Sequence, residues 1–176
     1  GRRDLTDAPL ILASASSSRR AMLEAAGVTV EIVPARIDEA ALKEGMTAEG
    51  ASPRDIADML AETKALRVAR RLEGGLVLGG DQLLVSAEGA IFDKPVDKAE
   101  AKEHLQMLSG KRHQLISAAV IAEHGRPVWR DIGQAVLEMR TLSDSFIDEY
   151  VESEWEQIRH CVGCYRIESR GAQLFT

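Results

Sequence analysis

The sequence is poor in cysteine, aromatic residues and net positive charge. It has two cysteines among 176 residues, Cys161 and Cys164, whereas a secreted domain held together by disulfides normally has more. Aromatic residues make up 4 % of the chain, so the core must be built from aliphatic side chains. The formal net charge of −6 gives no general attraction to nucleic acid or to an anionic membrane surface. These absences favour a cytoplasmic protein with neither nucleic acid nor membrane as its partner.

Long apolar runs and several common motifs are missing as well. No stretch approaches the ~20 apolar residues that a membrane-spanning helix needs, and the basic start at 1–5 lacks the apolar segment of a secretory signal. Neither GxxxxGK[ST] nor GxGxxG occurs, which excludes a P-loop and a dinucleotide fingerprint. The Cys161-x-x-Cys164 pair lacks convincing further zinc ligands, so we expect two small packed thiols.

The hydrophobic pattern predicts a mixed α/β fold. Helices are predicted at 19–26 and where a cap precedes periodic apolar residues, as at Ser52-Pro53, Asp97 and Ser143. The polar segment 35–52 is expected to be a loop. Strands alternate with helices early and pair with each other later, which favours a mixed twisted sheet with flanking helices. Strands are expected at 10–13, 29–33, 76–81, 83–85, 90–92, 114–122 and 128–140.

A turn rich in serine and arginine joins the first predicted strand to the first predicted helix. The free backbone N–H groups of a helix N-terminus attract anions, and hydroxyls and guanidinium groups add donors suited to phosphate. The pattern fits a phosphate site and an ordinary capped helix with solvated arginines about equally well. The donors of this turn are Ser14, Ser16, Ser17, Ser18, Arg19 and Arg20.

Acidic and basic residues elsewhere could serve the same anion. Asp81 follows a buried strand and two glycines, where an acid can hold a metal or take a proton from water, or simply cap a turn. Glu39 could supply a second carboxylate, although a solvated loop is the simpler interpretation. Lys94 is restrained by Pro95, whereas Lys64 in a helical pattern is expected to face solvent.

Taken together, these stretches resemble one family. The motifs "LILASASSSRR", "IDE", "ETKA", "GGDQ", "DKP", "LSGKRH" and "VGCYRIE" occur in the order and spacing of the Maf-like nucleoside triphosphate pyrophosphatases, from Pro9 to Phe175. The resemblance implies a cytoplasmic enzyme with a long mixed sheet and two lobes around a cleft, the Maf/ITPase-like fold. Such an enzyme uses a divalent metal, Mg²⁺ or Mn²⁺, to split a nucleoside triphosphate into the monophosphate and diphosphate.

The resemblance also implies roles for single residues. Asp81 is expected to act as the general base, and Glu39 to bind the metal, with Asp81, or to order the water. Lys64 and Lys94 are expected to neutralise the triphosphate, which overrides the solvent-facing interpretation of Lys64. Phosphate binding is expected from Ser14, Ser16, Arg19 and Arg20.

Substrate choice within the family varies at three positions, occupied here by Ser18, Gln82 and Glu168. Gln82 after the base and an acid at Glu168 are more similar to the 7-methyl-GTP subgroup than to the dTTP/UTP one. A carboxylate accepts hydrogen bonds from the guanine N1–H and 2-amino groups, and a methylated purine carries positive charge. The alternatives are a dTTP/UTP pyrophosphatase and a non-catalytic nucleotide-binding regulator of septum formation.

The resemblance implies one Maf-like domain over residues 1–176. Family members normally continue through a Gly-Leu-Pro segment into a final helix, which this sequence, ending at Thr176, is expected to lack. A homodimer is one possible assembly. The late motif departs from the family at Cys164, where Ala, Gly or Ser is more usual, and at Arg170, where a small residue often occurs.

Overall fold

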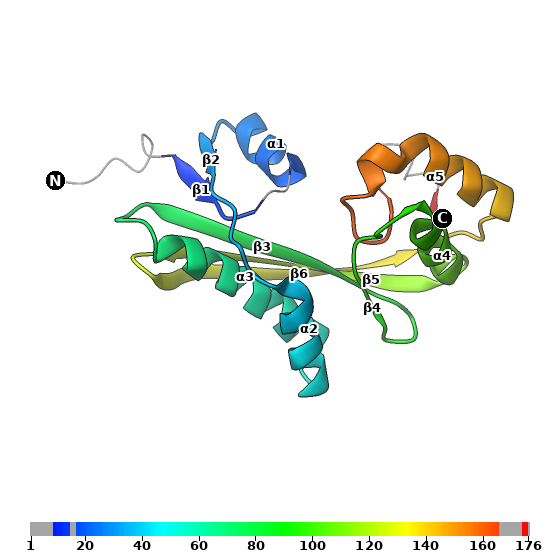
Figure 1. Ribbon diagram of the computed structural model, residues 1–176, viewed down its shortest axis with the longest axis horizontal. Helices are drawn as coiled ribbons and strands as arrows, with labels where there is room; N and C mark the ends of the chain where they lie inside the picture. Colours follow the sequence, from blue (N-terminus) through cyan, green and yellow to red (C-terminus); the bar gives the residue numbers. More distant parts are fainter. Residues whose placement is uncertain (1–8, 15–16, 166–173, 176) are drawn as a thin grey trace. The chain divides into compact units, whose positions relative to one another are not determined.

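The computed structural model describes residues 9–14, 17–165 and 174–175 (Figure 1). The chain forms two compact units, Gly1–Asp81 with Ser117–Gly133 and Gln82–Ile116 with Gln134–Thr176. We call them the first and the second unit, and each has its own core. In the described part of the chain, no helix is long and apolar enough to cross a membrane.

Five helices and six strands are described. The helices are α1 (Ser17–Ala25), α2 (Glu39–Ala48), α3 (Pro53–Ala69), α4 (Lys98–Leu108) and α5 (Asp144–Ile158). The strands are β1 (Leu10–Leu12), β2 (Val30–Ile32), β3 (Leu76–Val85), β4 (Ile91–Phe92), β5 (Arg112–Glu123) and β6 (Arg126–Glu138).

The strands form one mixed sheet in the order β2-β1-β3-β5-β6, with β4 paired to β3. β1 is parallel to both β2 and β3, whereas β3 and β4 form the expected antiparallel hairpin. The sheet and its flanking helices confirm the predicted α/β fold class. The cleft between lobes stays a prediction.

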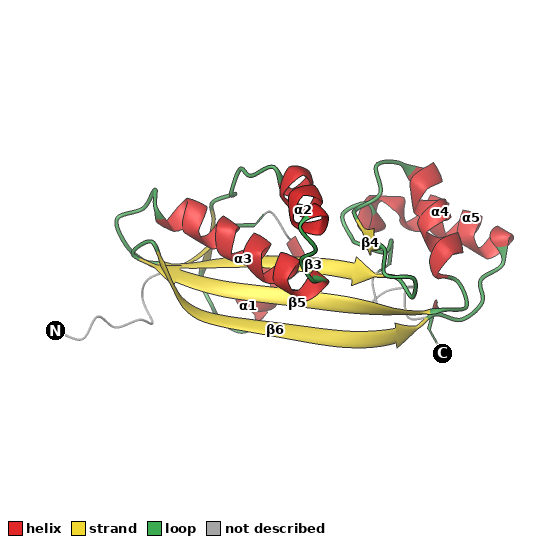
Figure 2. Ribbon diagram, turned by 90° about the horizontal axis from the view of Figure 1, so that it is seen from below, coloured by secondary structure: helices red, strands yellow, loops and turns green. Residues whose placement is uncertain are grey.

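Helix α3 packs closely on β3 because both elements present small residues at their contact. Ala61 and Ala65 are fully buried on α3. A Cβ at Gly79 of β3 would overlap the Ala61 carbonyl oxygen and lie 2.7 Å from the Ala65 nitrogen. Figures 1 and 2 show α3 and α1 on opposite faces of this part of the sheet. The aliphatic core of the first unit therefore lies against α3, with Leu12, Ile56, Leu60, Val68, Val77 and Val120 fully buried.

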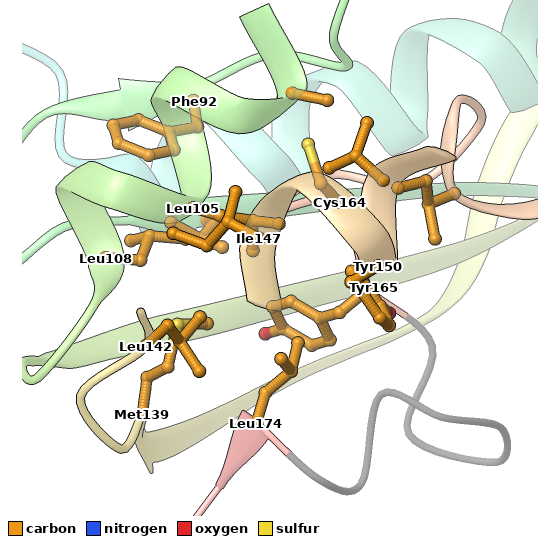
Figure 3. Close-up of a cluster of buried hydrophobic side chains, with 14 residues drawn as sticks. Phe92, Leu105, Leu108, Met139, Leu142, Ile147, Tyr150, Cys164, Tyr165 and Leu174 are labelled. Atoms are coloured by element: carbon orange, nitrogen blue, oxygen red, sulfur yellow. The ribbon is translucent and has the colours of Figure 1, made fainter. Parts of the chain in front are cut away.

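The second unit has a separate core between α4, α5 and the strands (Figure 3). Helix α4 begins after Asp97, whose carboxylate accepts the Glu100 N–H at 2.8 Å, and α5 begins after Ser143 in the same manner. Both predicted caps are confirmed. The buried members labelled in Figure 3 are Phe92, Leu105, Leu108, Met139, Leu142, Ile147, Tyr150, Cys164, Tyr165 and Leu174.

Two local predictions are wrong. Residues 39–48 form α2 instead of a loop, because Asp38 caps the helix by accepting the Ala41 N–H at 3.1 Å. Strand β3 does not end at Asp81 but continues to Val85, so Asp81 lies inside the strand. Both cysteines are free thiols, and the predicted packing is confirmed for Cys164, which is buried, whereas Cys161 is half-buried.

Candidate active site

The site lies where β1 ends beside the middle of β3, within the first unit. The parallel register places Leu12 opposite Leu78, and the Ala13 N–H donates to the Leu78 carbonyl at 2.9 Å. The chain after β1 therefore runs alongside the middle of β3. Ligands of open α/β sheets collect at the carboxyl ends of such strands.

Asp81 and Lys64 meet at the close contact between α3 and β3. Alternation along a strand puts Asp81 on the same face as Gly79, which is the face that α3 covers. Lys64, next to Ala65 on α3, is 8 % exposed and its ammonium lies 3.2 Å from Asp81 Oδ1. The same ammonium donates to the Gly80 carbonyl at 3.2 Å. Lys64 is therefore buried at the site, contrary to the pattern-based prediction and in line with the family resemblance.

The Asp81 carboxylate is buried, and one of its oxygens is unused. The side chain is 6 % exposed as a residue, and Oδ2 has no hydrogen-bond partner among the described residues. Burial raises the pKa of Asp81, while the positive charges of Lys64 and Lys43 act in the opposite direction. A carboxylate with a raised pKa and an unused oxygen is suited to accept a proton or to bind a cation.

Arg19 of α1 lies against the face of β3 opposite to the one that α3 covers (Figures 1 and 2). Gly80 has no side chain on this face, and a Cβ there would lie 2.5 Å from the Arg19 Cζ. The guanidinium also donates to Ser14 Oγ at 3.4 Å. Burial lowers the pKa of Arg19, and the charge of Asp81 raises it again. The two glycines thus leave room for other parts of the protein, α3 at Gly79 and Arg19 at Gly80.

The Arg20 guanidinium makes different contacts from that of Arg19. Its guanidinium forms an exposed ion pair with Glu24 of the same helix at 2.9 Å. Helix α1 has no acidic residue in its first turn, which favours an anion there. Ser18 belongs to that turn, and Ser16 lies outside the described residues. Phosphate binding by Arg20, Ser16 and Ser18 stays a prediction.

Helix α2 contributes Glu39 and a lysine that the sequence analysis missed. Glu39 is the first residue of α2, and its Oε1 lies 2.7 Å from the Lys64 ammonium. Lys43 follows four residues later, on the same helix face. The charge of Lys43 acts on Asp81. The spacing of Glu39 and Lys43 would have revealed this pair if the segment had been predicted as a helix.

Three predicted site residues do not belong to the described first unit. Gln82 follows Asp81 in β3 and is exposed, and Lys94 follows β4 and is also exposed. Both belong to the second unit. Glu168 lies outside the described residues.

The residues present fit a divalent metal with few protein ligands. No group of three or more His, Cys, Asp or Glu side chains that could hold a metal occurs in the described part of the chain. Asp81 and Glu39 nevertheless bring two carboxylates to one ammonium, and Asp81 Oδ2 is available. Mg²⁺ is commonly held by one or two carboxylates together with substrate phosphates and water, which matches this donor set.

Comparison with known proteins establishes the family of the chain. Residues 9–176 match the family model described as Maf-like protein. The chain belongs to the Maf-like family. A relative from Sphingopyxis alaskensis, named nucleoside triphosphate pyrophosphatase, is 51 % identical over 166 residues, covering 94 % of this chain and 84 % of the relative. Another from Ruegeria sp. with the same name is 48 % identical over 167 residues, covering 95 % and 83 %.

A solved structure has a similar fold. It is a HAM1 protein from Coxiella burnetii, with a TM-score of 0.50 and 18 % sequence identity. The match covers 74 % of this chain and 72 % of that protein. At this identity the likeness concerns the fold alone.

Proposed function

We propose that the protein hydrolyses nucleoside triphosphates between the α- and β-phosphates, with a preference for 7-methyl-GTP, and that Asp81 is the general base. Family membership and relatives named nucleoside triphosphate pyrophosphatases make the chain a nucleotide pyrophosphohydrolase. The observation that carries the assignment of the base is the buried Asp81 carboxylate, whose Oδ2 is without a partner among the described residues.

The charges of the site suit a polyphosphate. A triphosphate brings up to about four negative charges, which cations must neutralise before a nucleophile can approach phosphorus. Lys64 lies 3.2 Å from Asp81, and Lys43 acts on Asp81 electrostatically. Arg19 lies beside the neighbouring Gly80. Arg20 and Lys94 are proposed to bind the outer phosphates, with Ser14, Ser16 and the first turn of α1.

The proposed reaction is a single displacement by water. Asp81 Oδ2 takes a proton from a water molecule while the water oxygen bonds to the α-phosphorus. The bond from the α-phosphorus to the bridging oxygen then breaks, and pyrophosphate leaves with that oxygen. A divalent metal held by Glu39 and Asp81 would supply further charge neutralisation for the leaving group. Since positioning and electrostatics suffice, no covalent nucleophile is needed.

Base selection is assigned to Glu168 and Gln82. A carboxylate at 168 suits the N1–H and 2-amino donors of guanine and the positive charge of a 7-methylated ring, and no uracil or thymine offers that set. The amide of Gln82 follows the proposed base directly along the chain. The Gln82 side chain is exposed, so a ligand can reach it.

A substrate panel followed by phosphorus NMR tests the proposal. Wild-type protein with Mg²⁺ is expected to release pyrophosphate, with the highest kcat/KM for 7-methyl-GTP among 7-methyl-GTP, GTP, UTP and dTTP. Glu168→Gln is expected to lower kcat/KM for 7-methyl-GTP by about tenfold, the cost of one polar contact, and to leave that for UTP unchanged. Release of orthophosphate, or equal use of all four nucleotides, would contradict the proposal.

The role of Asp81 is tested in the same assay. Asp81→Asn is expected to abolish pyrophosphate release, since an amide cannot accept the proton. Asp131→Asn is the matched control, because Asp131 is an exposed aspartate on β6 of the same unit. Retained activity in Asp81→Asn would remove Asp81 from the mechanism.

A further inference from the structure

The Lys64 ammonium is fully occupied by the protein. An ammonium group has three N–H donors and no acceptor. Its three neighbours are the Gly80 carbonyl at 3.2 Å, Asp81 Oδ1 at 3.2 Å and Glu39 Oε1 at 2.7 Å. Lys64 therefore cannot bind a phosphate oxygen without giving up one of these contacts.

Lys64 also holds the two carboxylates that are suited to a metal. It bridges Glu39 and Asp81, as a divalent cation shared by two carboxylates would. The ion pair of 2.7 Å holds the Glu39 carboxylate, at the start of α2, against the Lys64 ammonium. The lysine thus serves as a built-in counter-ion of the carboxylate pair.

The surrounding charge disfavours a free metal ion at this place. The Lys64 ammonium lies between the carboxylates of Glu39 and Asp81, and the positive charge of Lys43 also acts on Asp81. A positive charge already seated between the two carboxylates repels Mg²⁺ or Mn²⁺ and attracts a polyphosphate. A nucleotide would reverse the balance, because its phosphates provide new acceptors for the lysine and negative charge for the metal.

We infer that Lys64 keeps Glu39 and Asp81 closed to a divalent cation in the free protein, and that the cation binds there only when a polyphosphate takes over the Lys64 ammonium. The inference rests on the proposed function, because it requires a polyphosphate substrate. It assigns Lys64 a second task besides charge neutralisation, the control of metal entry. Metal and nucleotide are then bound together and not one after the other.

The first test uses the wild-type protein and Mn²⁺, monitored by electron paramagnetic resonance. Titrations are done with and without α,β-methylene-GTP, whose α–β linkage cannot be hydrolysed, and are corrected for the Mn²⁺–nucleotide complex formed without protein. We expect the protein to bind Mn²⁺ at least about tenfold more tightly with the nucleotide, as the reversal of local charge requires. Equal affinities in the two titrations would overturn the inference.

The second test removes the ammonium. Lys64→Met keeps an unbranched side chain, one atom shorter and without the charge, and we expect it to bind Mn²⁺ about tenfold more tightly than wild type in the absence of nucleotide. Lys98→Met is the control, since Lys98 forms an exposed ion pair with Glu152 in the second unit. Unchanged or weaker Mn²⁺ binding by folded Lys64→Met overturns the inference.

The wild-type titrations decide alone if circular dichroism shows Lys64→Met to be unfolded. The proposed function is judged separately, by pyrophosphate release from the wild-type protein. An enzyme that releases pyrophosphate but binds Mn²⁺ tightly without nucleotide would refute only the inference about Lys64.

Discussion

Replacing Gly79 by alanine tests the contact on which the site is built. The new Cβ would overlap the Ala61 carbonyl oxygen and lie 2.7 Å from the Ala65 nitrogen and 3.0 Å from the Ala65 Cβ. All three atoms belong to the rigid, fully buried face of α3, so the clash cannot be relieved by a side-chain rotation. Helix α3 must move away from β3, and Lys64 must move away from Asp81 with it.

The expected cost follows from overpacking a close contact. Such insertions cost about 1–3 kcal/mol, and a clash with backbone atoms belongs to the upper end of this range. A loss of about 3 kcal/mol lowers Tm by roughly 6–12 °C in a domain of this size. Urea denaturation and thermal melts give the stability, and pyrophosphate release gives the activity, which is expected to fall as well.

Gly45→Ala provides the matched control. Gly45 lies within α2, and a Cβ there meets no atom within 4 Å. Alanine in a helix is favoured over glycine by about 0.5–1 kcal/mol, so this variant is expected to be slightly more stable. Wild-type stability in Gly79→Ala, or an equal loss in both variants, would refute the close packing of α3 on β3.

Three further predictions concern single residues. Burial raises the pKa of Asp81 in the folded state, so protonation of Asp81 stabilises the fold. This stabilisation is complete below the pKa of Asp81 in the unfolded state. It is lost as the pH rises through the higher pKa of the folded state. The free energy of unfolding of wild type minus that of Asp81→Asn should therefore fall with rising pH in urea titrations, and a constant difference would contradict the burial argument. Arg19→Ala is expected to lower kcat/KM about 100-fold and Arg20→Ala less than about fivefold, because Arg20 is exposed and paired with Glu24. A larger loss of kcat/KM in Arg20→Ala than in Arg19→Ala, measured in steady-state assays, would be inconsistent with this geometry. Ser52→Ala removes the acceptor of the Asp55 N–H and should cost about 1 kcal/mol by urea denaturation, and an unchanged midpoint would show that the cap does not stabilise α3.

The caps explain why most helices could be predicted from the sequence. Ser52, Asp97 and Ser143 each accept a backbone N–H three residues later, as their patterns predict. Asp38 makes the same contact, but the polar residues around it concealed α2, whose apolar residues Leu42 and Met46 are only half-buried. A helix without a continuous apolar face leaves a weaker signal in the sequence.

The site shows the same limit at the level of single residues. Lys64 looks like a solvent-facing helical lysine, because the sequence does not reveal that Gly79 and the alanines of α3 let the helix approach β3. Only the family resemblance pointed to Lys64, and nothing in the pattern pointed to Lys43. Contacts between residues distant in sequence, such as Lys64 with Glu39 and Asp81, depend on packing that local periodicity does not encode.

Determining which phosphorus the water attacks is the most direct test of the proposed reaction. Hydrolysis of 7-methyl-GTP in ¹⁸O-enriched water, followed by mass spectrometry of both products, reports where the water oxygen ends. Attack on the α-phosphorus, directed by Asp81, places the label in the nucleoside monophosphate. Label in the pyrophosphate would show attack on the β-phosphorus and contradict the role proposed for Asp81.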